Sequence, residues 1–424
     1  MNQAWTWCSL SELFEIGAGK TMSPAARNGL DKTPFLRTSN VFWDDIDLAS
    51  VDEMSVPTYE MPAKLLRQGD LVVCEGGEIG RAAVWDGRVE TISFQNHLHR
   101  LRPAVPDVEP RFYVFFLWSA FTQLGLYEGV GNKTTIPNLS RGRLAELQVP
   151  IPSFNEQRAI TAALGQIRDA IRRHKQITLL SQNLKRAAMQ TLFTHGVRGE
   201  VQKETEIGPM PESWKIASFA SVRKKLQYGT SVRCNYDPTN RPVLRIPNIE
   251  PQRINSNDLK YCKLAGKDAA KYRLEKNDLI FIRTNGVLDR LGSCAVYTGH
   301  PVNALFASYL IRARIKLDQA NPHFVAYFFS SEMGTNAIAR RATPASDGKF
   351  NLNTAIINGL PLPLPPTLSE QREIVAILDA IDRKIDLHRR KRALLEDLFK
   401  TLLHKLMTGK VAIEDMDLTA LKEN

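Results

Sequence analysis

The stretch "GAGKT", residues 17 to 21, has the residue types of a phosphate-binding P-loop, in which backbone N–H groups, a lysine and a hydroxyl hold a nucleotide. The complete pattern G-x-x-x-x-G-K-[ST] requires a glycine at position 14, where this chain has Phe14. The preceding residues have the apolar spacing of a helix rather than of the buried strand that leads into a P-loop. We therefore expect no nucleotide site, and ATP hydrolysis that depends on Lys20 is the least favoured of three possible functions.

The sequence has no complete pattern for metal ligation, methyl transfer, nuclease activity or a nucleophilic Ser or Cys. His97 and His99 would lie on one face of a strand and could ligate a metal, but no further ligands cluster nearby, which favours structural or surface histidines and no metal. An adenine methyltransferase needs a glycine-rich cofactor loop and a [DN]-P-P-[YF] tetrapeptide, and a metal-dependent nuclease needs clustered carboxylates with a lysine. Neither pattern occurs, nor does a Ser or Cys nucleophile motif. The chain is expected to be non-catalytic by itself.

The composition indicates a folded protein with a polyanionic partner. Of 424 residues, 43% are hydrophobic and 24% charged, and 56 Lys+Arg against 45 Asp+Glu give a net charge of +11. Such an excess favours nucleic acid, because each neutralised phosphate releases counterions. No membrane span and no signal peptide are recognised, and five scattered cysteines indicate reduced thiols, so a cytoplasmic location is expected.

The strongest feature is an internal repeat. "NEQRAITAALGQIRDAIRRHKQ" from residue 155 aligns without a gap with "SEQREIVAILDAIDRKIDLHRR" from residue 369, and the alignment continues to 194 and 408. Fainter matches lie upstream, such as "PFLRTSNV" with "PVLRIPNI" and "LQVPIP" with "LPLPLP". The order along the chain is therefore variable domain, long helix, variable domain, long helix.

Each variable domain has the pattern of a mixed helix and strand fold. Short β-rich runs such as "DLVVC" and "DLIFI" alternate with Gly, Asn and Asp turn signals, and "FYVFFLWSAFTQLGL" is typical of a helix. The predicted fold class is α+β, with two pseudo-repeated globular domains separated by two long antiparallel coiled-coil helices. The predicted boundaries are 1–152 and 210–366 for the globular domains, 153–198 and 367–410 for the helices, 199–209 for a linker and 411–424 for a C-terminal tail.

The repeated segments are predicted to be long helices that pair with each other. Asn155 and Ser369 are plausible N-caps, and Gly196 and Gly409 are plausible stops. Apolar residues at alternating steps of four and three define a pairing seam. The seam consists of Ile160, Leu164, Ile167, Ile171 and His174 in the first helix, and of Ile374, Leu378, Ile381, Ile385, His388, Leu395, Phe399 and Leu402 in the second. His174 and His388 would lie near a pseudo-twofold axis, or they are simply exposed; both alternatives stay open.

The pattern P-I-P-x-x-x-E-Q-R-x-I of the first copy has "LPPTLSEQREI" as its counterpart in the second, and a helix of about forty residues follows each. This organisation resembles the specificity (S) subunit of type I restriction-modification systems over essentially the whole chain. The resemblance implies two target recognition domains for a bipartite asymmetric DNA sequence, and helices that separate them and dock two modification (methyltransferase) subunits. Restriction (motor and nuclease) subunits would join the full complex. S-adenosylmethionine, ATP and Mg²⁺ would bind to these partners and not to this chain.

Candidate DNA-binding residues are polar side chains in the loops of each domain, because Arg, Lys, Asn and hydroxyl groups contact bases and phosphates. In the first domain they are Lys20, Thr21, Arg37, Asn40, Lys133, Thr134 and Arg141. In the second they are Thr230, Arg233, Arg245, Asn248, Arg283, Asn285, Arg290 and Lys349. The alternative function, from another class, is a protein-interaction scaffold whose basic charge is incidental.

Overall fold

The structure is a computed structural model that describes residues 5–127 and 138–416. The described residues form two compact units, of which unit 1 comprises residues 1–175 and 390–424 and unit 2 comprises residues 176–389. Each unit therefore holds one globular domain together with one half of each long helix. The predicted domain boundaries at 152 and 366 differ from this division, because each globular domain packs against both helices.

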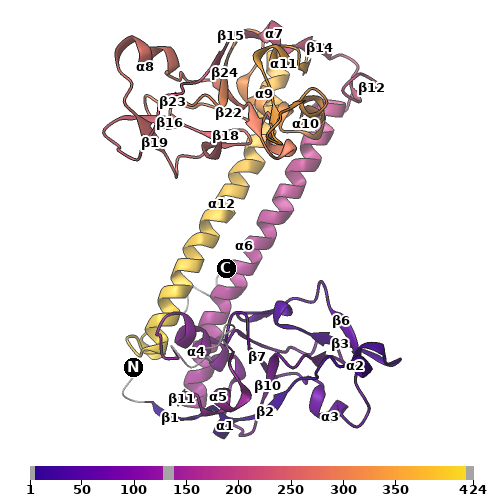
Figure 1. Ribbon diagram of the computed structural model, residues 1–424, viewed down its shortest axis with the longest axis vertical. Coiled ribbons are helices and arrows are strands. Elements are labelled where there is room, and N and C mark those ends of the chain that lie inside the picture. The colour runs from indigo at the N-terminus through magenta and orange to yellow at the C-terminus, as the bar shows by residue number, and fades with distance from the viewer. Residues whose placement is uncertain (1–4, 128–137, 417–424) are drawn as a thin grey trace. The chain divides into compact units, whose positions relative to one another are not determined.

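The long helices are α6 (Phe154–His195) and α12 (Leu368–Met407), drawn in magenta and yellow in Figure 1. Both begin one residue before the predicted N-caps. Ser153 Oγ accepts from the Glu156 amide, and Thr367 Oγ1 accepts from the Glu370 amide, at 3.3 Å in each case. Ser153 and Thr367 thus cap the helices, since an N-cap side chain accepts from an amide of the first turn, here three residues ahead. The predicted stops are confirmed: Gly196 and Gly409 have φ of +68° and +67°.

Unit 1 contains short helices and eleven strands among its described residues. The helices are α1 (Leu10–Leu13), α2 (Pro24–Asn28), α3 (Met61–Lys64), α4 (Pro110–Thr122) and α5 (Arg141–Glu146), with 3₁₀ turns η1 (Thr38–Asn40) and η4 (Ile413–Asp415). The strands are β1 (Thr6–Ser9), β2 (Phe14–Ala18), β3 (Lys32–Leu36), β4 (Val41–Phe42), β5 (Asp45–Ile46), β6 (Asp52–Ser55), β7 (Leu71–Cys74), β8 (Ala82–Val84), β9 (Ser93–Phe94), β10 (Leu98–Pro103) and β11 (Gln148–Ile151).

Unit 2 repeats this set and adds to it. Its helices are α7 (Phe219–Val222), α8 (Gly266–Tyr272), α9 (Pro322–Phe329), α10 (Glu332–Ala339) and α11 (Thr354–Asn358), with 3₁₀ turns η2 (Ile246–Asn248) and η3 (Leu288–Arg290). Its strands are β12 (Gln202–Lys203), β13 (Met210–Pro211), β14 (Lys215–Ser218), β15 (Arg223–Tyr228), β16 (Arg241–Leu244), β17 (Ile249–Glu250), β18 (Arg253–Ile254), β19 (Lys260–Cys262), β20 (Asp278–Ile282), β21 (Thr284–Asn285), β22 (Cys294–Val296), β23 (Leu305–Phe306), β24 (Leu310–Ile315), β25 (Thr343–Pro344), β26 (Phe350–Asn351) and β27 (Pro361–Leu364).

The two units share one sheet topology, which confirms the repeat in three dimensions. A four-stranded antiparallel sheet has the order β2-β10-β7-β8 in unit 1 and β15-β24-β20-β22 in unit 2. A three-stranded mixed sheet has the order β6-β3-β9 or β19-β16-β23, and a two-stranded sheet joins β1 to β11 or β14 to β27. Within each unit in Figure 1, α4 or α9 lies between these sheets and the long helices.

The seam positions are buried against both the other long helix and the globular domain. In unit 1, Ile160, Leu164, Ile167, Ile171, Phe399 and Leu402 share one apolar cluster with α4. In unit 2, Ile374 and Leu378 share a cluster with Phe193 and α9, and Ile385 is also buried. Ile381, Leu395, His174 and His388 are half-buried.

The two helices are antiparallel. In unit 2, Lys185 contacts Asp382 and Arg198 lies 4.0 Å from Glu370, so residue numbers rise along α6 as they fall along α12. All five cysteines are free thiols, and only Cys234 is not fully buried. Among the described residues, no helix is long and apolar enough to cross a membrane.

The repeated Glu-Gln pair fixes the start of each long helix to its domain. Gln371 is 1% exposed; its Oε1 accepts from the Asn321 amide at 2.7 Å, and its Nε2 donates to the Gln319 carbonyl at 3.4 Å. Glu370 accepts from the indole N–H of Trp214 at 3.2 Å. Glu156 and Gln157 make the corresponding bonds to Trp5 and the start of α4 in unit 1. The repeated motif is therefore an attachment between helix and domain.

Candidate nucleic-acid interface

In each unit, two residues face each other at one end of the central strands. In unit 2, Arg283 directly follows β20, Tyr309 directly precedes β24, and the Arg283 amide donates to the Tyr309 carbonyl at 3.1 Å. In unit 1, Glu75 follows β7, His97 precedes β10, and the Glu75 amide donates to the His97 carbonyl at 2.9 Å. We call these the strand-end pairs. Their backbone contacts are the same in both units, but their side chains differ.

The strand-end pair of unit 2 carries a cation that has no carboxylate partner within residues 5–127 and 138–416. The Arg283 guanidinium lies 5.1 Å from the centroid of the Tyr228 ring, and it donates to the Ser308 carbonyl at 3.4 Å. Tyr228 and Tyr309 are 40% and 59% exposed. Cation–π contact holds the plane of the guanidinium without neutralising its charge.

Three sequence candidates of unit 2 come together around this pair. Asn285 lies in β21, which pairs through Phe350 with β26, and Lys349 immediately precedes that strand. Asp347 lies 2.6 Å from the Lys349 ammonium, and this carboxylate raises the pKa of Lys349. Arg283, Asn285 and Lys349 thus form one polar, partly aromatic surface.

Lys20 belongs to a basic group in unit 1 and not to a P-loop. Its Nζ lies 2.7 Å from Glu60, and Lys64 donates to the carbonyls of Ala18 at 2.7 Å and Gly19 at 3.1 Å. Burial lowers the pKa of Lys64; Glu60 opposes this effect, and the nearby charges of Lys20, Arg100 and Arg141 add to it.

Gly19 and its counterpart Gly229 are required by a close approach of two backbones rather than by a turn. A Cβ atom on Gly19 would lie 2.1 Å from the Gln95 carbonyl oxygen, and one on Gly229 would lie 2.2 Å from that of Ala307. The shared glycine lets the chain pass directly over the neighbouring strand.

Three of the predicted DNA-binding residues are structural. Asn40 is 4% exposed and Asn248 is 1% exposed, and each amide oxygen accepts from the backbone of the preceding arginine at 2.9 Å. Each also donates to two carbonyls of the following loop. Thr230 is 4% exposed and accepts from the Val232 amide. In this structure these side chains are buried and hold their loops together.

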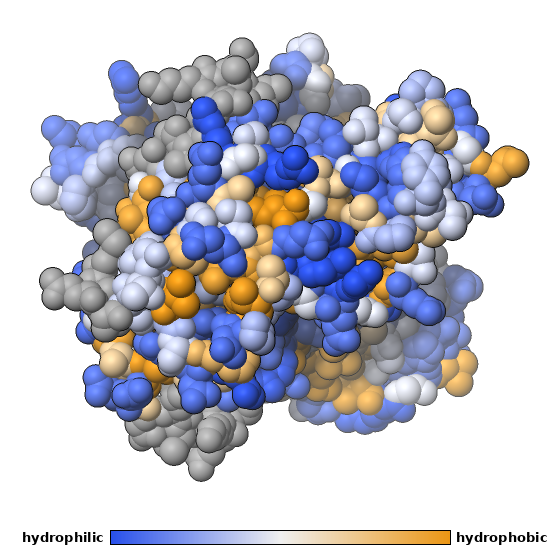
Figure 2. Space-filling view, turned by 90° about the horizontal axis from the view of Figure 1, so that it is seen from below, coloured by the Kyte–Doolittle hydropathy of each residue, from blue (hydrophilic) through white to orange (hydrophobic). Residues whose placement is uncertain are grey.

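The remaining candidates lie at the surface in different settings. Arg37 pairs with Asp52 and Arg245 pairs with Asp258, both at 2.8 Å. Thr21, Arg141, Arg233 and Arg290 are exposed. Lys133 and Thr134 lie outside the described residues. Figure 2 shows one face of the molecule, on which hydrophilic side chains surround apolar residues near the centre of the view.

His99 in β10 and His97, which directly precedes that strand, do not form a metal site. His99 is buried and bonds through Nε2 to the Leu139 carbonyl at 2.8 Å, and burial lowers its pKa. His97 is exposed and lies 3.7 Å from Glu75. Among the described residues, no cluster of His, Cys, Asp or Glu side chains could hold a metal ion.

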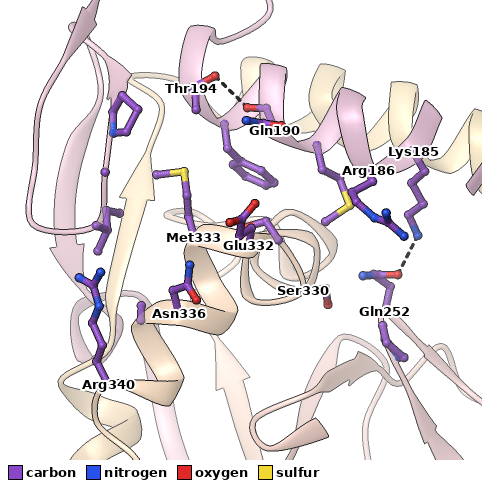
Figure 3. A pocket seen from close by; sticks show the side chains of 18 of the residues that line it. Lys185, Arg186, Gln190, Thr194, Gln252, Ser330, Glu332, Met333, Asn336 and Arg340 are labelled. Atoms are coloured by element: carbon purple, nitrogen blue, oxygen red, sulfur yellow. Dashed lines mark hydrogen bonds between the residues drawn. The ribbon is translucent and has the colours of Figure 1, made fainter. Parts of the chain in front are cut away.

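A polar contact joins the second domain to both helices of unit 2. Lys185 of α6 donates to both carboxylate oxygens of Asp382 and to Gln252 Oε1, each at 2.8 Å, and Tyr327 donates to Asp382 at 2.7 Å. Burial lowers the pKa of Lys185, and Asp382 opposes this effect. Figure 3 shows Lys185 and Arg186 at the rim of a cavity of about 480 Å³ that α10 closes with Met333, among other residues.

Unit 1 joins its domain to the helices with different groups. Arg168 occupies the α6 position that corresponds to Asp382, and its guanidinium lies 5.0 Å from the Trp118 ring and 5.6 Å from the Phe399 ring. Asp44, at the position of Gln252, pairs with Arg111 at 2.7 Å. The two domains are thus attached rigidly but by chemically distinct contacts.

Both long helices expose leucine pairs at repeat-related positions. Leu180 and Leu184 of α6 are 56% and 55% exposed in unit 2, and Leu394 and Leu398 of α12 are 70% and 45% exposed in unit 1. Residues four apart lie on one face of a helix, so each unit presents one apolar pair.

The sequence analysis missed Tyr228, Tyr309, Glu75 and the exposed leucines as functional candidates. The sequence did contain a signal for the leucines, because Leu180 and Leu184 lie four residues apart on α6 and outside the seam positions. For the tyrosines no local signal exists, since Tyr228 joins Arg283 only through the pairing of β15, β24 and β20.

Comparison with known proteins places the chain in a family. The model of the type I restriction modification DNA specificity domain matches it twice, at residues 2–180 and 211–397, and the chain belongs to this family. Each match covers one globular domain and the first part of the helix that follows it.

Among curated relatives, the EcoKI specificity subunit of Escherichia coli K12 is 27% identical over 69% of this chain and 65% of its own length. A putative MjaX specificity subunit of Methanocaldococcus jannaschii is 30% identical over 49% of each chain. The matches thus span less than two thirds of these two relatives. The StySPI specificity subunit of Salmonella potsdam is 24% identical over 97% of this chain and 90% of its own.

Two solved structures share the fold. The S subunit of a type I restriction-modification system from M. genitalium aligns with a TM-score of 0.61 at 16% identity, over 96% of this chain and 97% of its own. A chain from a study of complex assembly and conformational transition of the type I R-M system aligns with a TM-score of 0.55 at 16% identity, over 97% and 99%.

Proposed function

We propose that this protein is the sequence-specific DNA-binding subunit of a type I restriction-modification complex. Each globular domain acts as a target recognition domain for one half of a bipartite, asymmetric site. The observation that carries this proposal is the duplication of one fold with different side chains at matching surface positions. The net charge of +11 and the family match support a DNA ligand.

The long helices fix the spacing of the half-sites and dock two methyltransferase subunits. The attachment of each helix start through a Glu-Gln pair, in which the glutamine is buried, supports a rigid spacer. The exposed leucine pairs, one in each unit, support two similar partners. The chain itself is non-catalytic; S-adenosylmethionine, ATP and Mg²⁺ bind to the methyltransferase and restriction subunits of the full complex.

The DNA part of the proposal is tested by duplex binding at increasing salt. The chain, purified with its methyltransferase subunits, should bind random duplex with a log–log salt slope of several units. Methylome sequencing of a host with and without this gene should show one bipartite asymmetric motif that depends on it. A duplex affinity that does not change with salt concentration, together with no gene-dependent methylation motif, would instead favour the protein-interaction scaffold.

The docking part is tested by a paired substitution. Leu180→Lys with Leu184→Lys should reduce the number of methyltransferase subunits per chain from two to one, because burying two lysines at an apolar contact is unfavourable. Native mass spectrometry measures the ratio. The matched control is Leu179→Lys, since Leu179 is 52% exposed on another face of α6 and has no leucine counterpart in α12. Two bound subunits in the double variant contradict this docking site.

A further inference from the structure

The two strand-end pairs carry side chains of opposite charge, Arg283 in unit 2 and Glu75 in unit 1, at equivalent backbone positions. The equivalence follows from the hydrogen bonds within each unit. In unit 2, the Leu352 amide donates to the Arg283 carbonyl at 2.7 Å; in unit 1, the Leu139 amide donates to the Glu75 carbonyl at the same distance. The backbone around the two positions is therefore equivalent. What differs is that a guanidinium stands where the other unit has a carboxylate.

Arg283 is placed to donate to a ligand that offers two hydrogen-bond acceptors. Its Nε is buried and has no hydrogen-bond partner among the described residues, while the guanidinium lies against the Tyr228 ring and makes one long bond to the Ser308 carbonyl. A half-buried cation without a counter-ion gains from an acceptor that replaces water. The Tyr228 ring orients the Arg283 guanidinium. The N–H groups of Arg283 then form a fixed fork that matches O6 and N7 of guanine in the major groove.

Glu75 in unit 1 has the opposite chemistry. Its side chain is 20% exposed, and the imidazole of His97 lies 3.7 Å from its carboxylate. A carboxylate is repelled by phosphates, so near DNA its favourable contact is an amino group on a base edge. In the major groove, the N4 amino group of cytosine is the usual partner of Glu.

We propose that the strand-end pairs determine one base in each half-site: Arg283, oriented by Tyr228, contacts a guanine in the half-site of the second domain, and Glu75, held by His97, contacts a cytosine in the half-site of the first. The inference rests on the proposed DNA-recognition function. It adds the residues and the base class for each domain.

The test uses the full chain with its methyltransferase subunits in a host that lacks other modification systems, and methylome sequencing gives the motif. Arg283→Ala should turn one guanine of one half-site into an unspecified base, with a roughly 10- to 100-fold loss of preference, and leave the other half-site unchanged. Arg283→Lys keeps the charge but not the fork, so it should lose the same preference while duplex affinity stays close to the wild type. Glu75→Gln should relax one cytosine in the opposite half-site.

Matched controls separate base contact from charge and from folding. Lys276→Ala removes a positive charge from an exposed residue next to the opposite end of β20, and Glu90→Gln neutralises another exposed acid in unit 1; both should leave the motif intact. Circular dichroism and the methyltransferase ratio show whether each variant is folded and assembled.

The outcomes distinguish the two proposals. A wild-type complex without any gene-dependent motif overturns the proposed function. A wild-type bipartite motif that Arg283→Lys and Glu75→Gln leave unchanged in folded complexes overturns only the strand-end inference. Relaxation at a base other than guanine for Arg283, or other than cytosine for Glu75, also overturns it.

Discussion

Replacement of Gln371 by alanine tests whether the repeated motif attaches helix to domain. The substitution removes the acceptor of the Asn321 amide at the start of α9 and the donor to the Gln319 carbonyl, at a side chain that is 1% exposed. A buried N–H left without a partner costs about 1–3 kcal/mol. The lost methylene adds about 0.8 kcal/mol. We expect unit 2 to lose about 2–4 kcal/mol of its free energy of unfolding.

Urea unfolding measures this loss. With a denaturant slope of about 2 kcal/mol/M, the midpoint should fall by about 1–2 M. Hydrogen exchange of peptides that cover the start of α9 should rise in the same variant, because the backbone amide of the N-cap residue Asn321 loses its acceptor. The control is Arg372→Ala, at the adjacent exposed position. A midpoint within about 0.2 M of the control would refute the reasoning.

The variant Gln371→Glu separates the two hydrogen bonds. The carboxylate can still accept from Asn321, but it places a second acceptor opposite the Gln319 carbonyl. Protonation restores a donor, so the stability of this variant relative to the wild type should improve as pH falls. A pH-independent difference would show that the second bond contributes nothing.

Three further predictions concern stability. Lys185→Ala should cost about 2 kcal/mol because it leaves Asp382 without its cation, whereas Lys185→Met with Asp382→Leu should cost less, which a double-mutant cycle measures. Because burial lowers the pKa of His99, the unfolded state takes up the proton first, and unit 1 should lose stability as pH falls below about 6.5. His99→Gln should flatten that part of the pH profile, and an unchanged profile would refute this role. Gly229→Ala, whose Cβ would meet a backbone oxygen at 2.2 Å, should lower the unfolding temperature by several degrees. Gly286→Ala, which meets nothing within 4 Å, should change it little, and equal shifts would contradict the close-approach explanation.

Local patterns in the sequence predicted the architecture well. The spacing of apolar residues by four and three predicted the two long helices, because periodicity depends on residues that are close in sequence. The internal repeat predicted the duplicated domain, because similar sequences adopt similar folds. The same reasoning rejected a nucleotide site at "GAGKT", and the structure gives its lysine a carboxylate partner, Glu60. The helix caps were wrong by two residues, since either of two nearby polar residues could have served.

The sequence by itself determined the two-domain, two-helix organisation and the expectation of a basic DNA-binding surface. Only the tertiary structure decided which polar side chains are available. Asn40 and Arg283 are both polar residues next to short strands, yet Asn40 is buried with its bonds satisfied and Arg283 keeps unbonded donors beside Tyr228. The physical reason is that burial and pairing depend on strands far apart in the chain, whereas periodicity depends only on residues within a few turns.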